Sequence, residues 1–175
     1  LPNRFELQLK YLVQHPEVDI LGGQISEFIG IPENIIGKRV VPCTNSEIYN
    51  FMKSRCAFNH MTVMFHKDAV LKAGNYQDWF WNEDYYLWVR MMKTKCQFAN
   101  VPEVLVNVRS GADLYARRGG RKYYESEKGI KKLQLDNKMI TKMEYRYFVA
   151  QRYIIQILMP NWLRGWVFRT LARKK

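Results

Sequence analysis

The stretch WFWNEDYYLWVR, residues 79–90, sets two acidic residues among six aromatic ones. From Glu83 onward, Leu87, Trp88 and Met91 recur at helical spacing, so we expect a helix that begins at the acidic pair. Carboxylates in a first turn are stabilised by the positive end of the helix dipole. Glu83 and Asp84 are therefore either helix-capping residues or general-base candidates whose pKa is raised in a partly dry aromatic pocket.

Upstream of this stretch, helical and strand-like segments alternate. A helix is expected from Pro2 or Asn3 to the residue before Pro16, and a short helix is expected to follow the capping box of Thr44 and Glu47. Gly22 and Gly23 allow the backbone either to bend or to approach a neighbour closely. We further expect a buried strand over 18–21 that extends through 24–28, loops at 30–37 and 55–59, a central strand over 61–65, and a helix from 67 to about 74.

Downstream, two strands over 96–100 and 104–109 are expected, joined across residues 101–103. A basic turn at 117–122 then leads to helices over 123–137 and 142–159 and to a basic amphipathic helix from Trp162. The alternation up to residue 109 predicts an α/β sandwich with too few strands for a complete doubly wound nucleotide-binding fold. We therefore expect about half of a domain.

Composition excludes several classes of protein. The chain has 175 residues, 47% of them hydrophobic, which is enough for one folded core, and it lacks the run of about 18 apolar residues that spans a bilayer. Three cysteines without a C-x-x-C pair encode neither a disulfide framework nor a zinc ribbon, and they favour a reducing, cytosolic compartment.

The net charge of +12 is concentrated in one part of the chain. Residues 1–108 hold 11 basic and 11 acidic side chains, whereas residues 109–175 hold 17 basic and 5 acidic ones. A basic region of this kind suits a nucleic acid, an anionic membrane or a phosphorylated substrate.

Four motifs, in order along the chain, resemble the family 2 glycosyltransferases with the GT-A fold. They are LPNRFELQ at 1–8, NHMTVMF at 59–65, EDYYLWVR at 83–90 and VLVNVR at 104–109. The resemblance covers about residues 1–125. It implies an α/β chain that forms the C-terminal part of a GT-A fold, with an acceptor-side half over 1–116 and a basic helical extension over 117–175.

The resemblance also implies roles for individual residues. Asp84 corresponds to the base that deprotonates the acceptor hydroxyl, and Glu83 would orient Asp84 or the acceptor. Trp88 would stack on a sugar ring, and Arg90 would pair with a phosphate or with the acidic pair. At helical spacing, both Trp88 and Arg90 also fit purely structural roles.

Further substrate-binding candidates flank these motifs. Asn59 and His60 would line the acceptor site, although a histidine before an apolar strand is commonly structural. Arg109, Arg117 and Arg118 would contact a diphosphate or lipid phosphate, with a solvated basic turn as the alternative. The sequence after Arg109 lacks the histidine that many family members carry there.

The chain contains no D-x-D sequence, the motif that holds the divalent metal and the nucleotide in this family. The resemblance therefore implies that the complete enzyme uses Mn²⁺ or Mg²⁺, that no metal ligands lie in this chain, and that the chain is a fragment without turnover of its own. The implied partners are a nucleotide-sugar donor and a growing or lipid-linked saccharide acceptor of capsular or other cell-envelope polysaccharide synthesis in a bacterium.

Two other classes of function compete with this interpretation. Trp162 and Trp166 share one helical face opposite Arg and Lys, which indicates peripheral binding to the inner face of a membrane rather than to a nucleic acid. An ordinary packed helix with solvated basic residues is the structural alternative for this segment. A noncatalytic basic module that binds nucleic acid, or a membrane-associated scaffold, remains the alternative.

Overall fold

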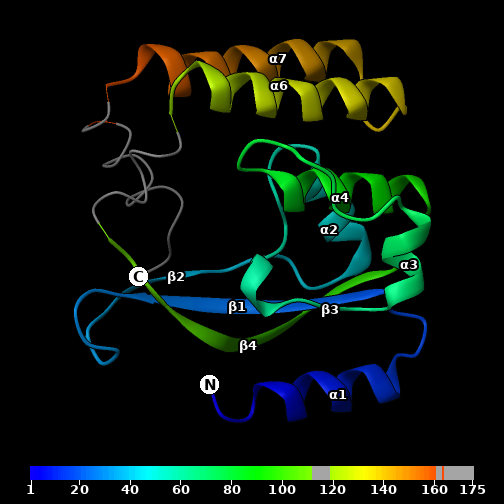
Figure 1. Cartoon of the computed structure of the whole chain (residues 1–175), viewed down its shortest axis with the longest axis vertical. Helices are drawn as coiled ribbons and strands as arrows, with labels where there is room; N and C mark the ends of the chain where they lie inside the picture. Colours follow the sequence, from blue (N-terminus) through cyan, green and yellow to red (C-terminus); the bar gives the residue numbers. More distant parts are fainter. Residues whose placement is uncertain (112–118, 161–162, 164–175) are drawn as a thin grey trace.

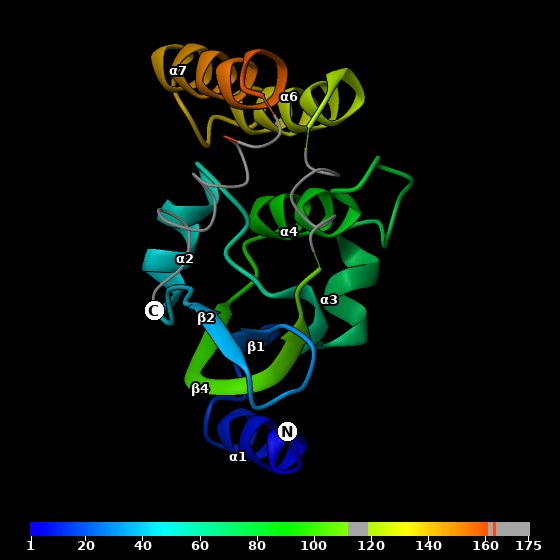
Figure 2. The ribbon, with the colours of Figure 1, turned by 90° about the vertical axis from the view of Figure 1, so that its left-hand side faces the viewer.

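The computed structural model describes residues 1–111, 119–160 and 163. The elements lie in layers, with helix α1 (Arg4–Gln14) on one face of a four-stranded sheet and helices α2 (Asn45–Met52), α3 (Lys67–Lys72) and α4 (Glu83–Lys93) on the other (Figures 1 and 2). Helices α6 (Arg121–Asp136) and α7 (Lys142–Tyr153) lie side by side outside α4. A π-helical turn, η2 (Ile154–Leu158), continues α7.

Strand β1 (Ile20–Phe28) is the centre of the sheet and is buried along its whole length. Along one edge it pairs in parallel with β4 (Phe98–Arg109). Along the other edge it pairs antiparallel with β2 (Ile35–Arg39) at one end and β3 (Met64–Phe65) at the other. A Cβ added at Gly22 would lie 2.3 Å from the Asn100 Oδ1, so the close approach expected at this glycine pair is confirmed.

Two apolar clusters hold the layers together. Leu7, Tyr11 and Leu12 of α1 pack against a small cluster beneath the sheet that includes Leu21 and Leu105. The main core lies above the sheet, and Ile130 of α6 belongs to the same cluster as Trp88 of α4. The first helix of the basic region therefore shares its core with the rest of the chain.

The expected helices are confirmed where local signals define them. Helix α1 ends before Pro16, the box formed by Thr44 and Glu47 caps α2, and α4 begins at Glu83. The helices expected over 67–74, 123–137 and 142–159 are also present as α3, α6 and α7 with η2. The expected turn at 117–122 falls partly, and the final amphipathic helix almost wholly, outside the described residues.

The prediction of a central strand over 61–65 is wrong. Residues His60–Thr62 form a 3₁₀ turn, η1, and only Met64–Phe65 are extended. The turn forms because the Asn59 Nδ2 donates to the Gly23 carbonyl (2.8 Å) and the Thr62 Oγ1 donates to the Asn59 carbonyl (2.7 Å). These polar side chains bond to the backbone in place of a strand ladder.

Two other strand assignments are corrected. The loop expected over 30–37 instead contains the start of β2. The two strands expected after Cys96 are one strand, β4, which passes through Pro102: Gly23 pairs with Val101 and Gln24 with Val104, so residues 102–103 form an unpaired bulge. A bulge tolerates proline, which has no N–H to donate to the ladder.

The described helices were compared with the length and hydropathy that a membrane-spanning helix needs. Among the described residues, no helix is both long enough and apolar enough to cross a bilayer.

Candidate active site

The carboxylate of Asp84 lies in the first turn of α4, directly after the N-cap residue Asn82 and Glu83. The Tyr85 N–H donates to the Asp84 Oδ1 (2.6 Å), and the Asp84 Oδ2 lies 3.9 Å from the His60 Nδ1. The Asp84 side chain is 21% exposed and that of His60 is 41% exposed. The Asp84 side chain is thus largely buried, with part of its surface in contact with solvent.

The surroundings of Asp84 tune its proton affinity in opposite directions. Burial, the largest effect, raises the pKa of Asp84, and the negative charge of Glu83 adds to the rise. His60, the Tyr85 N–H and Arg39 lower it, but the net pKa stays above the ordinary value. A carboxylate with a raised pKa is the stronger proton acceptor, as a general base requires.

Tyr76 completes this cluster, although its sequence context predicts no such role. Its Oη lies 3.0 Å from the His60 Nε2, and the two rings stack with centroids 5.8 Å apart. Burial raises the pKa of Tyr76 to about 12, with the charges of Asp84 and Glu83 contributing. The phenol therefore stays protonated at neutral pH, and it is 38% exposed beside the carboxylate.

Asn59 is placed for support rather than for substrate contact. It is 1% exposed, and its Oδ1 accepts from the Arg39 Nη1 (2.7 Å) while its Nδ2 bonds to the Gly23 carbonyl. Arg39 of β2 also donates to the carbonyls of Phe58 (2.9 Å) and Cys56 (2.7 Å). Arg39, which the motifs do not include, and Asn59 together hold the segment that presents His60.

Trp88 and Arg90 have structural roles in place of the expected substrate contacts. Trp88 is 0% exposed and packs against Phe58 (ring centroids 5.8 Å apart), so it has no face open to a sugar. The Arg90 guanidinium donates to the carbonyls of Ala73 (2.8 Å) and Asn75 (2.7 Å). The Trp88 ring also lies edge-on to the rings of His60 and Tyr76 (centroids 6.0 and 6.2 Å apart), so it packs beneath the cluster around Asp84.

Arg109 lies at the end of β4. Its Nη1 donates to the Gly30 carbonyl (2.5 Å), and its guanidinium lies over the Phe28 ring, 5.1 Å from the centroid. It thus braces the β1–β2 turn, and its expected phosphate contact stays a prediction. Arg117 and Arg118 lie outside the described residues.

Helix α6 holds the aromatic segment that leads into the acidic pair. The Trp79 ring stacks on Tyr86 (centroids 4.0 Å apart), and its Nε1 donates to the Ser126 carbonyl (3.1 Å). The Ser126 Oγ donates to the Phe80 carbonyl (2.8 Å) and accepts from the Asn82 Nδ2 (3.0 Å). One serine of α6 therefore anchors the backbone just before Glu83.

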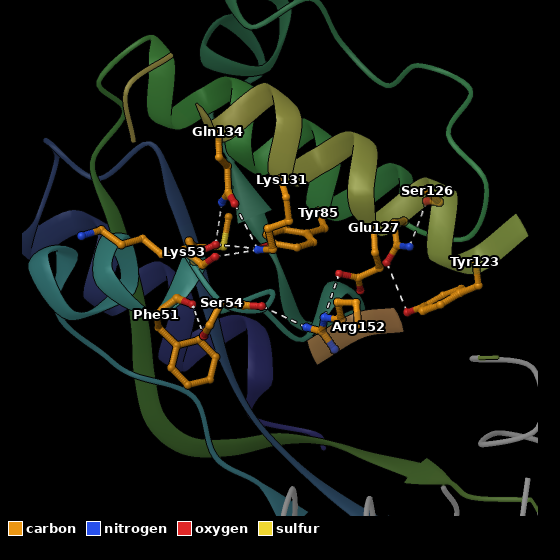
Figure 3. Close-up of polar contacts among 12 residues, drawn as sticks. Phe51, Lys53, Ser54, Tyr85, Tyr123, Ser126, Glu127, Lys131, Gln134 and Arg152 are labelled. Atoms are coloured by element: carbon orange, nitrogen blue, oxygen red, sulfur yellow. Dashed lines mark hydrogen bonds and ion pairs between the residues drawn. The ribbon is translucent and has the colours of Figure 1, made fainter. Parts of the chain in front are cut away.

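A second contact from α6 reaches the residue after Asp84, and α7 supports α6 from outside. Figure 3 shows Lys131 between Tyr85 and Gln134, with its Nζ 2.8 Å from the Tyr85 Oη and 3.0 Å from the Gln134 Oε1. In the same view Arg152 of α7 pairs with Glu127 of α6 (3.3 Å). Helix α6 is thus bonded to the helix that carries the carboxylate, and α7 is paired with α6.

The residues described do not fit a divalent-metal site. Within 1–111, 119–160 and 163, no three His, Cys, Asp or Glu side chains gather in a ligand cluster. The charges that act on the Asp84 carboxylate include the cation Arg39, which repels a metal ion.

No protein-family model matches the chain. Several bacterial proteins are similar to it, three of them over at least three quarters of its length. They are an uncharacterized glycosyltransferase of Haemophilus influenzae (37% identity over 99% of this chain), the amylovoran biosynthesis glycosyltransferase AmsE of Erwinia amylovora (40% over 77%), and the UDP-Gal:alpha-D-GlcNAc-diphosphoundecaprenol beta-1,3-galactosyltransferase of Escherichia coli (32% over 98%). The chain spans 64%, 50% and 62% of their respective lengths. Over nearly its whole length, the chain is therefore homologous to bacterial glycosyltransferases.

Proposed function

We propose that the chain is the acceptor-side, base-bearing part of an inverting family 2 glycosyltransferase with the GT-A fold, acting in bacterial surface-polysaccharide assembly. The observation that carries the proposal is the Asp84 carboxylate, whose pKa is raised by burial while its side chain stays 21% exposed. Homology to bacterial glycosyltransferases supports the same chemistry. Residues 1–116 form the acceptor-side half in this proposal, and residues 117–175 form its basic helical extension.

In the proposed reaction, Asp84 accepts the proton of an acceptor hydroxyl. The hydroxyl oxygen forms a bond to the anomeric carbon of a nucleotide sugar as the bond from that carbon to the diphosphate breaks. The bonding electron pair leaves with the nucleoside diphosphate, and the configuration at the carbon inverts. Glu83 and His60 orient the carboxylate and the acceptor, and Tyr76 offers its phenol to a second hydroxyl.

The proposed acceptor is a saccharide linked through diphosphate to a lipid, and the proposed donor is a UDP-sugar. Both are suggested by the name of the E. coli relative, which uses UDP-Gal and a GlcNAc-diphosphoundecaprenol. The donor's nucleotide, and any Mn²⁺ or Mg²⁺ that neutralises its diphosphate, are assigned to residues outside this chain, because the chain has no D-x-D sequence.

The test measures sugar transfer by the full-length gene product to an alkyl-linked α-GlcNAc diphosphate, with a panel of UDP-sugars. Asp84→Asn is expected to lower kcat at least about 100-fold, because a positioned base contributes on the order of 10²–10⁴. Asp78→Asn changes an exposed carboxylate six residues away and is the matched control, expected to keep full activity. Full activity of Asp84→Asn would contradict the proposal, as would turnover by the 175-residue chain alone.

Helix α7 and the turn η2 supply the proposed contact with the anionic inner face of the cytoplasmic membrane. Four of their apolar side chains are 53–80% exposed and recur at helical spacing on one face: Met143, Tyr147, Ile154 and Leu158. Lys142 and Arg146 are exposed on the same helix, which lies in the outermost layer (Figure 2). An apolar stripe beside basic residues is typical of helices that lie in a membrane interface.

Sedimentation with vesicles tests this contact. We expect the chain to sediment with phosphatidylglycerol-rich vesicles at low salt, and Tyr147→Ser with Leu158→Ser to weaken this binding at least about tenfold. The matched control is the double variant Leu9→Ser with Val13→Ser, which replaces two exposed apolar side chains of α1 on the other side of the sheet. It is expected to bind vesicles like the unmodified chain. Equal losses in both double variants would contradict the assignment to α7.

A further inference from the structure

A buried serine of α6 holds the residue at which α4 begins. Ser126 is 7% exposed, and its Oγ donates to the Phe80 carbonyl (2.8 Å) and accepts from the Asn82 Nδ2 (3.0 Å). Asn82 is the N-cap residue of α4, and its carbonyl accepts the first helical hydrogen bond, from the Tyr86 N–H (2.9 Å). The start of α4 therefore depends on one hydroxyl group of another helix.

Two neighbours of Ser126 on α6 contact the same loop, residues 79–82. Tyr123, Ser126 and Gly129 follow one another at a spacing of three residues, on one side of α6. The Tyr123 Oη donates to the Asn82 Oδ1 (3.3 Å). A Cβ added at Gly129 would lie 2.6 Å from the Trp79 Cζ2, so the glycine lets the Trp79 ring pack closely on α6. This side of α6 is therefore shaped to hold the loop.

The backbone of the loop is held in a conformation that a bulky residue adopts at an energetic cost. Trp81 lies between the two residues that bond to the Ser126 Oγ, and its φ is +58°, in the left-handed region. Such a conformation persists only where the surrounding structure enforces it. Without the Ser126 hydroxyl group, we expect this backbone to relax and the N-cap residue Asn82 to move with it.

Movement at the N-cap residue would reach the proposed base. Asp84 follows Asn82 by two residues, in the first turn of α4. Its Oδ2 lies 3.9 Å from the Nδ1 of His60, which belongs to the separate turn η1. The position of the carboxylate relative to η1 is therefore set where α4 starts. A misplacement of about 1 Å at a reacting group can cost about 100-fold in rate.

We infer that Ser126 is a positioning residue of the proposed reaction, which fixes the start of α4 so that the Asp84 carboxylate meets the acceptor hydroxyl. Helix α6, which the proposed function places in the basic extension, thereby contributes to the rate of sugar transfer. The inference rests on the proposed function, because it assumes that Asp84 is the base.

Sugar transfer by the full-length gene product tests this role, with alkyl-linked α-GlcNAc diphosphate as acceptor and a panel of UDP-sugars as donors. Ser126→Ala is expected to lower kcat at least about tenfold, with KM for donor and acceptor unchanged, because only the base is displaced. Ser126→Thr keeps the hydroxyl group and is expected to keep most of the rate. Thr94→Ala is the matched control, because it removes a hydroxyl group that bonds to the Met91 carbonyl (3.0 Å) at the other end of α4. It is expected to keep full kcat.

The pH dependence of kcat/KM distinguishes positioning from a loss of stability alone. Loosening the loop in Ser126→Ala admits water to the Asp84 carboxylate and reduces the burial that raises its pKa. The acidic limb of the profile is therefore expected to move to lower pH, whereas a partly unfolded variant would keep the position of that limb. The charged and titratable groups around the carboxylate are the same in both proteins: Glu83 of α4, His60 of η1, Arg39 of β2, Tyr76 and Cys56.

Hydrogen exchange of the 175-residue chain, followed by mass spectrometry, gives a readout that needs no turnover. Ser126→Ala is expected to speed exchange in residues 79–86 and to leave α1 unchanged. Full kcat in a folded Ser126→Ala variant would overturn the inference, and if Asp84→Asn still lost activity, only the positioning role would fall. Full activity of Asp84→Asn would instead contradict the proposed function and, with it, any positioning through Asp84.

Discussion

Replacing the buried Lys131 by methionine is expected to change how stability depends on pH. The lysine is 0% exposed, and its Nζ donates to the Lys53 carbonyl (2.6 Å), the Tyr85 Oη and the Gln134 Oε1. Burial lowers the pKa of Lys131 from 10.5 to about 7, an effect that Arg152 adds to and Glu127 opposes. The amine is therefore much easier to deprotonate in the folded chain than in the unfolded one.

The size of the effect follows from this difference of about 3.5 pH units. Each unit corresponds to 1.36 kcal/mol, so the folded state is penalised by about 5 kcal/mol below pH 7, where the amine is charged in both states. Between pH 7 and 10.5 only the unfolded chain holds the proton, and stability rises by up to about 1.4 kcal/mol per pH unit. Above pH 10.5 the amine is neutral in both states and the penalty is gone.

Lys131→Met removes this penalty together with three hydrogen bonds worth about 1 kcal/mol each. The variant is therefore expected to be more stable than the unmodified chain at pH 7 and less stable at pH 9.5. The difference in unfolding free energy between the two proteins is expected to change by about 3 kcal/mol across this interval.

Urea unfolding of both chains at pH 7, 8, 9 and 9.5 measures this difference, with equal m values as the check on the comparison. Lys132→Met is the matched control, because Lys132 is exposed and bonds only to Asp136 among its described partners (2.7 Å). If the difference in unfolding free energy between Lys131→Met and the unmodified chain changed with pH as little as that of Lys132→Met, the burial of the Lys131 amine and its lowered pKa would be refuted.

Three further predictions concern residues near the sheet and the carboxylate. Gly23→Ala is expected to lower the free energy of unfolding, measured in urea, by about 1–3 kcal/mol, because the new Cβ would lie 2.5 Å from the Leu105 Cδ1. Gly111→Ala is the control and is expected to lower it far less, because a Cβ there would meet no atom within 4 Å. Burial raises the pKa of the Cys56 thiol to about 12, so iodoacetamide at pH 8 is expected to label it roughly a thousandfold more slowly than free cysteine; rapid labelling by mass spectrometry would contradict this. Asp84→Asn is expected to raise Tm at pH 7, because the raised pKa means that the folded state disfavours the charged carboxylate; a lower Tm would contradict that sign.

Short-range signals account for the features that could be predicted before the fold was known. Pro16 ends α1, the box of Thr44 and Glu47 caps α2, and helical periodicity starts α4 at Glu83. Each of these features depends on residues within one or two helical turns, so the local sequence is sufficient to predict it. The order of four motifs likewise predicted the homology to bacterial glycosyltransferases.

The partners of the carboxylate depend on contacts between distant segments. Arg39 and His60 reach Asp84 because β1 brings β2 and η1 to the same end of α4, and Lys131 reaches Tyr85 across 46 residues. The same packing buries Trp88 and leaves Trp81 exposed, although both are tryptophans within five residues of Asp84. The sequence by itself determined the local elements and the acidic pair. Only the tertiary structure decided what surrounds that pair, because burial and charge at one residue are set by segments far from it along the chain.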